Sequence, residues 1–196
     1  MPYGVDLDRF YPCAERSESE FRLLFVGNIS VRKGVRYLLE AFQQLDCKRK
    51  HLTLVGSLSP ELESTVQHIR HSDQISVMGH VPQQDLKKIM SRSHVMVLPS
   101  VEEGMACVQA QVMACGCPVI ASQNTGAQDL FTDGREAFIV PICDSQAIAD
   151  RLQMLADDPD LVTRMGDAAL ARVKSIGGWQ EYGDRMYQIF LGAIAS

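Results

Sequence analysis

The sequence predicts an α/β protein built on a doubly wound parallel sheet of about six strands. Two observations carry this prediction: short apolar runs alternate with helical patterns along most of the chain, and several of these runs end at glycine or serine. Strands buried on both faces by helices read as continuous apolar runs, as these do. The expected arrangement is Rossmann-like, in which ligands bind beyond the carboxyl ends of the strands.

The elements follow in order. Strands are expected where apolar residues form short runs bounded by glycine, proline or polar residues, at 22–27, 51–56, 74–79, 94–100, 118–121 and 137–141. The first helix is expected at 33–45, because apolar residues recur there at the spacing of one helical face. A proline in the first turn marks a helix at 60–69. Further helical stretches are expected at 83–90, 106–114, 145–157, 159–174 and 179–194, and a short segment at 127–131 lies between the last two strands.

The chain divides into three parts. Residues 1–20 carry turn-forming and charged residues, so we expect an extended lead-in with a solvated acidic stretch. Residues 21–178 hold all six predicted strands and form the sheet domain. Residues 179–196 form a last helix, which is apolar on one side.

Composition excludes several classes of protein. The 196 residues carry a net charge of −5, which disfavours a nucleic-acid partner, and no apolar run reaches the length of a membrane helix. The start of the chain lacks the pattern of a secretory signal, so we expect a cytoplasmic protein. Six cysteines show no metal-binding spacing, and we expect them to be buried, reduced thiols.

The loop at 27–34 has the composition of a diphosphate site. Gly27 and Gly34 allow close approach of the backbone, the following helix start offers free N–H groups, and Arg32 and Lys33 add two cations. The loop lacks the spacing of a Walker A motif. The alternative interpretation is an ordinary turn with solvated basic residues.

Three further polar loops follow strands at the same expected edge. In the loop at 99–106, Glu103 could accept hydrogen bonds from sugar hydroxyls, and the N–H groups of Met105 and Ala106 could face a phosphate, although acidic residues also cap helices. The loop at 122–127 is polar, and the loop at 79–82, with His80, could line a base pocket or be purely structural. All four loops are expected to converge.

The order of these motifs resembles the donor-binding, C-terminal domain of retaining GT-B glycosyltransferases of family 4, the glycosyl transferases group 1. The resemblance runs along nearly the whole chain. Its motifs are the segments 3–6 (with Phe10 and Pro12), 25–27, 33–34, 38–42, 54–56, 79–81, 97–100, 103–104, 113–121, 126, 133–134 and 138–141.

The resemblance implies one half of a GT-B fold and a hexosyltransferase-type enzyme that transfers a sugar from a nucleoside diphosphate. Lys33 and Glu103 are implied as catalytic residues, Lys33 on the diphosphate and Glu103 on the transferred sugar. The implied donor-binding residues are Gly27, Asn28, Arg32, Lys33, Gly79, His80, Val81, Glu103, Gly104, Met105, Ala106, Cys107 and Gln111. No metal and no cofactor are expected.

The chain departs from the family pattern at a few positions. Asn28 stands where the family usually has arginine, and Arg32 is a candidate for the second cation. Gln111 replaces the family's second glutamate and could bond a ribose diol without charge assistance. Asp129 and Ala137 stand where glutamate and glycine are usual.

A GT-B enzyme also has an N-terminal, acceptor-binding domain, which the resemblance implies as the partner of this chain. We expect the isolated domain to bind donor without completing catalysis. The last helix should leave part of its apolar face uncovered and pack toward that partner, and membrane contact is expected only through the partner. The alternatives are half of a nucleotide-sugar epimerase and a non-catalytic nucleotide-binding module. A dinucleotide dehydrogenase is disfavoured because no predicted strand precedes GxGxxG.

Overall fold

The computed structural model describes residues 1–69 and 72–194. Its centre is a six-stranded sheet in the order β3-β2-β1-β4-β5-β6, and every neighbouring pair is parallel. The strands are β1 (Phe21–Val26), β2 (Lys50–Val55), β3 (Ile75–Met78), β4 (Val95–Leu98), β5 (Val119–Ser122) and β6 (Ala137–Val140). The strand order reverses between β1 and β4, which makes this the switch point of a doubly wound sheet. The predicted fold class is confirmed.

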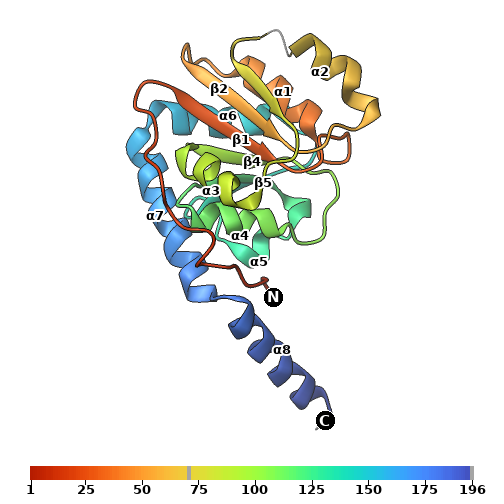
Figure 1. Cartoon of the computed structure of the whole chain (residues 1–196), viewed down its shortest axis with the longest axis vertical. Helices are drawn as coiled ribbons and strands as arrows, with labels where there is room; N and C mark the ends of the chain where they lie inside the picture. The colour runs from red at the N-terminus through yellow and green to blue at the C-terminus, as the bar shows by residue number, and fades with distance from the viewer. Residues whose placement is uncertain (70–71, 195–196) are drawn as a thin grey trace.

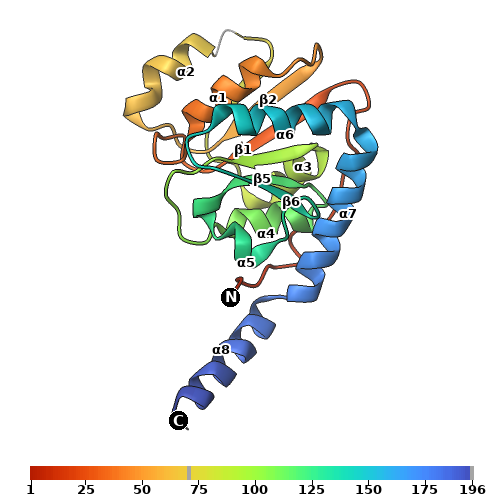
Figure 2. The ribbon, with the colours of Figure 1, turned by 180° about the vertical axis from the view of Figure 1, so that it is seen from behind.

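Helices cover both faces of the sheet. They are α1 (Val35–Gln44), α2 (Glu63–Ile69), α3 (Gln83–Arg92), α4 (Cys107–Ala114), α5 (Ala127–Leu130), α6 (Ser145–Asp157), α7 (Pro159–Ile176) and α8 (Trp179–Ile194). The helices α3 and α4 lie on the face toward the viewer in Figure 1, and α1 and α6 lie on the opposite face, as Figure 2 shows. The core between these layers is made mainly of strand residues and of the inner faces of α1, α4, α6 and α7.

The predicted elements are all present, with local differences in their ends. The helix predicted at 33–45 begins at Val35, because Gly34 takes a left-handed conformation with φ of 67° as its N-cap. The helix predicted at 60–69 begins as a single 3₁₀ turn, Pro60–Leu62, before α2 continues. Both differences lie where a loop leads into a helix. Apolar spacing says least about the structure there, because it does not define the residue at which a helix begins.

The lead-in is held against the sheet domain. Val5 and Phe10 are 3% and 2% exposed, and the Val5 N–H donates to the carbonyl of Gly177 over 3.3 Å. Arg16 donates from Nε to the carbonyl of Ser93 over 3.1 Å and also bonds the carbonyl of Gly116. These contacts fix the path of the lead-in beside α3 and α4.

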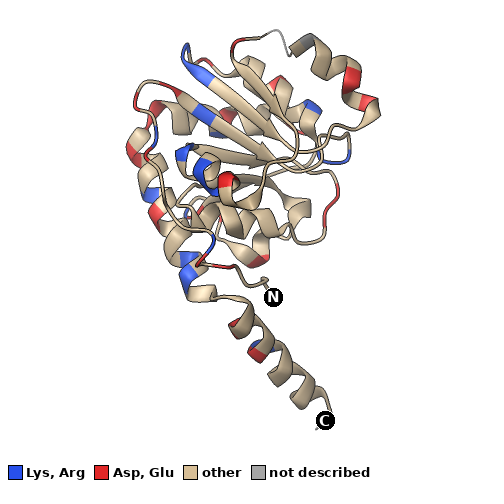
Figure 3. Ribbon diagram, in the orientation of Figure 1, with Lys and Arg blue, Asp and Glu red and all other residues tan. Residues whose placement is uncertain are grey.

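The last helix, α8, extends away from the sheet domain (Figure 1), and none of its residues is buried. Tyr3, Trp179 and Tyr182 form an aromatic cluster at its first turn, with ring centroids 5.5–6.1 Å apart. Its last nine described residues, 186–194, carry no charge, as Figure 3 shows. Exposed apolar side chains on this helix are Trp179, Tyr187, Ile189, Phe190, Leu191 and Ile194. The predicted uncovered apolar face is therefore present.

We predict that His94 makes the fold sensitive to mild acid. Its Nδ1 accepts the Arg22 N–H and its Nε2 lies 3.0 Å from the Ser17 carbonyl oxygen, so the bonded form is neutral. Burial, together with the charge of Arg16, lowers the pKa of His94 to about 4. The unfolded chain binds more protons between this value and the ordinary pKa, so stability falls as the pH drops through that window. We expect a loss of about 1–2 kcal/mol between about pH 7 and about pH 5.

Urea denaturation of the wild type and of His94→Gln at both pH values measures this loss. The variant should lose clearly less stability than the wild type over the same interval. Equal losses in the two proteins would show that other groups carry the acid sensitivity. His80→Gln is the matched control, because His80 is exposed and should leave the wild-type profile unchanged.

Candidate functional site

Three of the four predicted loops meet at the carboxyl edge of the sheet and are hydrogen-bonded to one another. The Val101 N–H donates to the Arg32 carbonyl over 2.9 Å, which joins the loops after β1 and β4. Asn124 Nδ2 donates to the Val101 carbonyl over 2.9 Å, which adds the loop after β5. The fourth loop, at 79–82, follows β3 at the edge of the sheet and leads into α3. The switch point thus assembles a polar surface from distant parts of the chain.

Lys33 and Glu103 form an ion pair at the centre of this surface. Lys33 Nζ donates to Glu103 Oε2, and Ser100 Oγ donates to the same carboxylate oxygen over 3.4 Å. The side chains of Lys33 and Glu103 are only 13% and 17% exposed, so the pair is largely shielded from water. The two residues predicted to act on the donor therefore lie in direct contact.

The helix starts at this surface carry no side-chain caps. Neither α1 nor α4 has a capping side chain or an acidic residue in its first turn. By contrast, Asp144 and Asp158 cap α6 and α7 and bond backbone N–H groups over 2.8 and 2.9 Å. Uncapped starts retain backbone donors and the positive end of the helix dipole, which suit an anionic ligand. The Ala106 N–H is an exception, since it points at the Thr125 carbonyl over 3.4 Å.

Asn28 and Arg32, in the loop after β1, are both exposed. Asn28 Nδ2 donates to Ser59 Oγ over 3.2 Å, which ties the loop to the segment after β2. Arg32 Nη1 donates to the Glu102 carbonyl over 3.3 Å, so its guanidinium lies against the loop that carries Glu103. The structure thus brings Arg32 to the surface where a second cation is expected, while Asn28 faces the neighbouring loop.

The remaining predicted residues lie at the rim. Gly79, His80 and Gly104 are exposed, and Val81 and Met105 are partly buried. Cys107 and Gln111, one helical turn apart on α4, line a hollow of about 200 Å³ between α4, α3 and the lead-in. The departures Asp129 and Ala137 lie elsewhere: Asp129 is exposed and 3.5 Å from the N-terminal amine, and Ala137 is buried at the start of β6.

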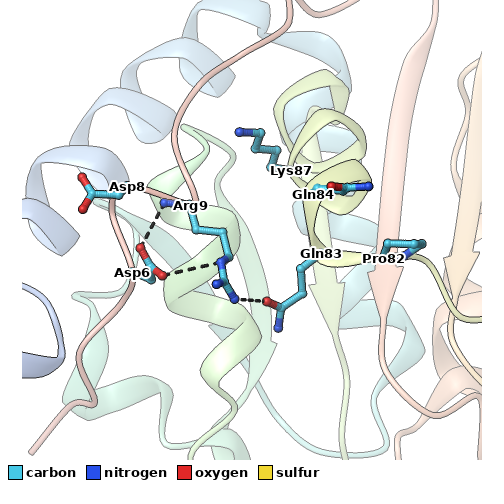
Figure 4. A pocket seen from close by; sticks show the side chains of 7 residues that line it. All are labelled: Asp6, Asp8, Arg9, Pro82, Gln83, Gln84 and Lys87. Atoms are coloured by element: carbon cyan, nitrogen blue, oxygen red, sulfur yellow. Dashed lines mark hydrogen bonds and ion pairs between the residues drawn. The ribbon is translucent and has the colours of Figure 1, made fainter.

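The hollow beside α4 is also lined by Arg9 and Gln83, which were not singled out from the sequence, and by Asp6, the last residue of the motif at 3–6. Asp6 and Arg9 come from the lead-in and Gln83 from the first turn of α3 (Figure 4). Arg9 Nη1 donates to Gln83 Oε1 over 2.5 Å. These two residues are separated by 74 positions in the chain, and neither belongs to a recognisable motif, so no local pattern could have joined them.

The cysteine prediction was wrong in part. All six thiols are free, but Cys13, Cys107 and Cys143 are exposed rather than buried. Burial raises the pKa of Cys115 and of Cys117 to about 12, so those two behave as apolar side chains. Within residues 1–69 and 72–194, no group of three or more histidine, cysteine or acidic side chains is placed to hold a metal ion. None of the helices in the same range is both long and apolar enough to cross a bilayer.

The sheet order and this edge define a Rossmann-like domain with Lys33, Arg32 and two uncapped helix starts at its switch point. Comparison with known proteins then places it. The sequence profile of the family Glycosyl transferases group 1 matches residues 20–158. The chain therefore belongs to this family, as the sequence motifs predicted.

Individual relatives agree with this assignment. The D-inositol 3-phosphate glycosyltransferase of Streptomyces scabiei is 32% identical, over 97% of this chain and 48% of that protein. Sucrose-phosphate synthase from Thermosynechococcus elongatus superimposes with a TM-score of 0.85 and 28% identity, covering 99% of this chain and 52% of that one. The chain thus spans about half the length of these relatives.

A domain solved on its own matches over almost its whole length. The C-terminal domain of the group 1 family protein LpcC from Francisella tularensis superimposes with a TM-score of 0.79 and 24% identity. The match covers 88% of this chain and 97% of that domain. At this identity the likeness concerns the fold alone.

We predict that Gly34→Ala disrupts the site's frame. Gly34 has a left-handed φ of 67°, and a Cβ at this position would overlap the carbonyl oxygen of Pro99. Because backbone cannot give way as a side chain can, the loops after β1 and β4 would have to separate. We expect a loss of at least about 2 kcal/mol in the free energy of unfolding, measured by urea denaturation.

Gly183→Ala is the matched control for this substitution. Apart from its chain neighbours and the backbone of its own helix, no atom of the described residues lies within 4 Å of a Cβ at this position in α8, so stability should be unchanged or slightly higher. If Gly34→Ala were as stable as the control, the close packing of the two loops would not be a constraint on the fold.

Proposed function

We propose that this chain binds the nucleoside diphosphate-sugar donor of a glycosyltransferase. The observation that carries the proposal is the shielded ion pair between Lys33 and Glu103, set between the uncapped starts of α1 and α4. A diphosphate placed there meets a cation and free N–H groups, and a sugar attached to it meets a carboxylate. The family and the relatives named above, which are transferases, support transfer over epimerisation.

The donor would exchange partners with this ion pair. Lys33 Nζ would turn from the Glu103 carboxylate to a phosphate oxygen, and Glu103 would then be free to accept hydrogen bonds from sugar hydroxyls. Negative charge builds on the diphosphate as the bond to the sugar breaks. Fixed cations and N–H groups at Lys33, Arg32 and α4 would stabilise that charge more in the transition state than in the bound donor.

We propose further that the reaction proceeds with retention and without a metal ion. Retention rests on the resemblance to family 4. Metal independence rests on the cations that the chain itself supplies at the diphosphate, Lys33 and Arg32. Ribose would be held through Gln111, with the base beyond it toward Val81.

The acceptor would be bound by a second domain, as in GT-B enzymes. The uncharged, exposed stretch 186–194 of α8 gives such a domain an apolar surface to cover. On this proposal the chain alone binds donor without turnover, in the cytoplasm, and any contact with a membrane runs through the second domain.

Isothermal titration calorimetry with UDP, GDP, ADP and dTDP and their glucose or mannose conjugates tests donor binding. We expect one nucleotide class to bind at micromolar to millimolar strength, and Lys33→Ala to weaken it about tenfold or more. Glu103→Gln should raise the affinity for the nucleoside diphosphate without a sugar, because the substitution releases Lys33 and removes a negative charge. The same variant should lose the preference for the sugar conjugate.

Lys48→Ala is the control for the loss of a positive charge. Lys48 is exposed just before β2, at the amino edge of the sheet, so binding should match the wild type. A failure of every nucleotide to bind, or equal effects of Lys33→Ala and Lys48→Ala, would overturn the proposed donor site. Donor binding without turnover in the parent protein would favour the non-catalytic module instead.

A further inference from the structure

Two hollows beside α3 and α4 adjoin at lining residues that they share, and we call the pair the trough. The smaller, of about 200 Å³, is lined by Cys107 and Gln111 on α4, and the larger, of about 610 Å³, extends along α3 (Figure 4). Both hollows are lined by Asp6, Arg9 and Gln83. Gln111 and Gln83 therefore both line the smaller hollow.

Asp6, Arg9 and Gln83 contact one another in sequence beside the trough, through an ion pair and a hydrogen bond. The Asp6 carboxylate accepts the Arg9 backbone N–H over 3.0 Å and lies 3.6 Å from Arg9 Nε. Arg9 Nη1 in turn donates to Gln83 Oε1 over 2.5 Å. Asp6 itself is fixed by the turn that it begins, in which the Phe10 N–H donates to its carbonyl over 2.9 Å. The lead-in thus places the Arg9 guanidinium, on an exposed side chain, against the first turn of α3.

The hydrogen bond between the exposed side chains of Arg9 and Gln83 sets which end of the Gln83 amide faces Arg9. A guanidinium has donors and no acceptor, so the amide must turn its oxygen toward Arg9. Its nitrogen then points away from Arg9, as Figure 4 shows. Among the residues that the structure describes, none accepts a hydrogen bond from Gln83 Nε2. Gln83 therefore offers the trough a donor and no acceptor.

The nearby polar groups do not offer the same feature. Lys87 is engaged by the hydroxyl of Tyr11 over 2.7 Å, and Asp6 by Arg9. Gln84 is exposed and has no partner that would fix its amide among the described residues, so it can turn either end toward a ligand. Gln83 is the side chain whose donor is held in place by a neighbour.

We propose that Gln83, positioned by Arg9, makes the site select nucleobases with an oxo group over those with an amino group. This inference rests on the proposed function, with the diphosphate at the start of α4 and the ribose at Gln111. Uracil and guanine carry a carbonyl oxygen where cytosine and adenine carry an amino group. A fixed N–H donor bonds the oxo bases, whereas against an amino group two donors face each other and remain unsatisfied.

Calorimetry with matched pairs of nucleotides tests the selection. UDP and CDP share the same ring size and diphosphate, as do GDP and ADP. We expect UDP to bind this chain about three- to tenfold more tightly than CDP, the ratio that one hydrogen bond supports. If a purine fits the trough, GDP should bind more tightly than ADP by a similar ratio.

Substitutions then separate selection from general binding. Gln83→Glu presents only acceptor oxygens, so the ratio of UDP to CDP should invert. Gln84→Glu is the control, because it adds the same negative charge to the same wall and should leave the ratio as in the wild type. Arg9→Met lets the Gln83 amide turn either end toward the base. The ratio of UDP to CDP affinity should then approach one, whether or not the overall affinity falls.

The outcomes distinguish this inference from the proposed function. If UDP and CDP bind alike and lose affinity together in Lys33→Ala, the donor site stands and the role of Gln83 is overturned. A ratio that Gln84→Glu and Gln83→Glu shift equally would also overturn it. If no nucleotide binds, the proposed function fails and this inference fails with it. An inverted ratio in Gln83→Glu alone would support the assignment.

Discussion

The parallel pairing of β1 with β4 is the constraint on which the site depends. Leu23 and Leu24 stand beside Val95 and Met96 in this pairing, although about 70 residues of chain separate them. Because both strands run in the same direction, their loops leave the sheet at the same edge and lie side by side. The Val101 to Arg32 backbone bond extends the pairing beyond the strands. Without this neighbourhood, no contact between Lys33 and Glu103 would form.

Glycine allows the loops at this edge to approach more closely than side chains permit. A Cβ at Gly34 would overlap the Pro99 carbonyl, and one at Gly56 would overlap the carbonyl of Gly27. Both glycines also have positive φ angles. Backbone packed directly on backbone leaves little freedom to the loops, so the charged side chains that they carry start from fixed positions. A site with little reorganisation to undergo binds a charged ligand at lower cost.

The sequence predicted the strands, the main helices and the meeting of polar loops at one edge, because these follow from apolar spacing and from chain order. The ion pair between Lys33 and Glu103 was not predicted. The sequence placed the start of α1 two residues early, since the left-handed turn at Gly34 is set by packing on Pro99 and not by periodicity. It also missed the contact of Arg9 with Gln83. That contact depends on where the lead-in lies after folding, and the anchoring of the lead-in by Phe10 is a tertiary effect.

The shielded ion pair between Lys33 and Glu103 affects whether the proposed site prefers the free diphosphate or its sugar conjugate. Both side chains are largely shielded from water, so a ligand that takes Lys33 leaves a carboxylate without its cation. An unpaired, shielded charge is costly unless new hydrogen bonds satisfy it. A nucleoside diphosphate alone supplies an acceptor for Lys33 but no donor for Glu103. The sugar conjugate supplies both, since its hydroxyl groups donate to the carboxylate. The ion pair therefore weakens binding of the product diphosphate relative to binding of the complete donor. This difference would help the site to release the product and to bind a new donor.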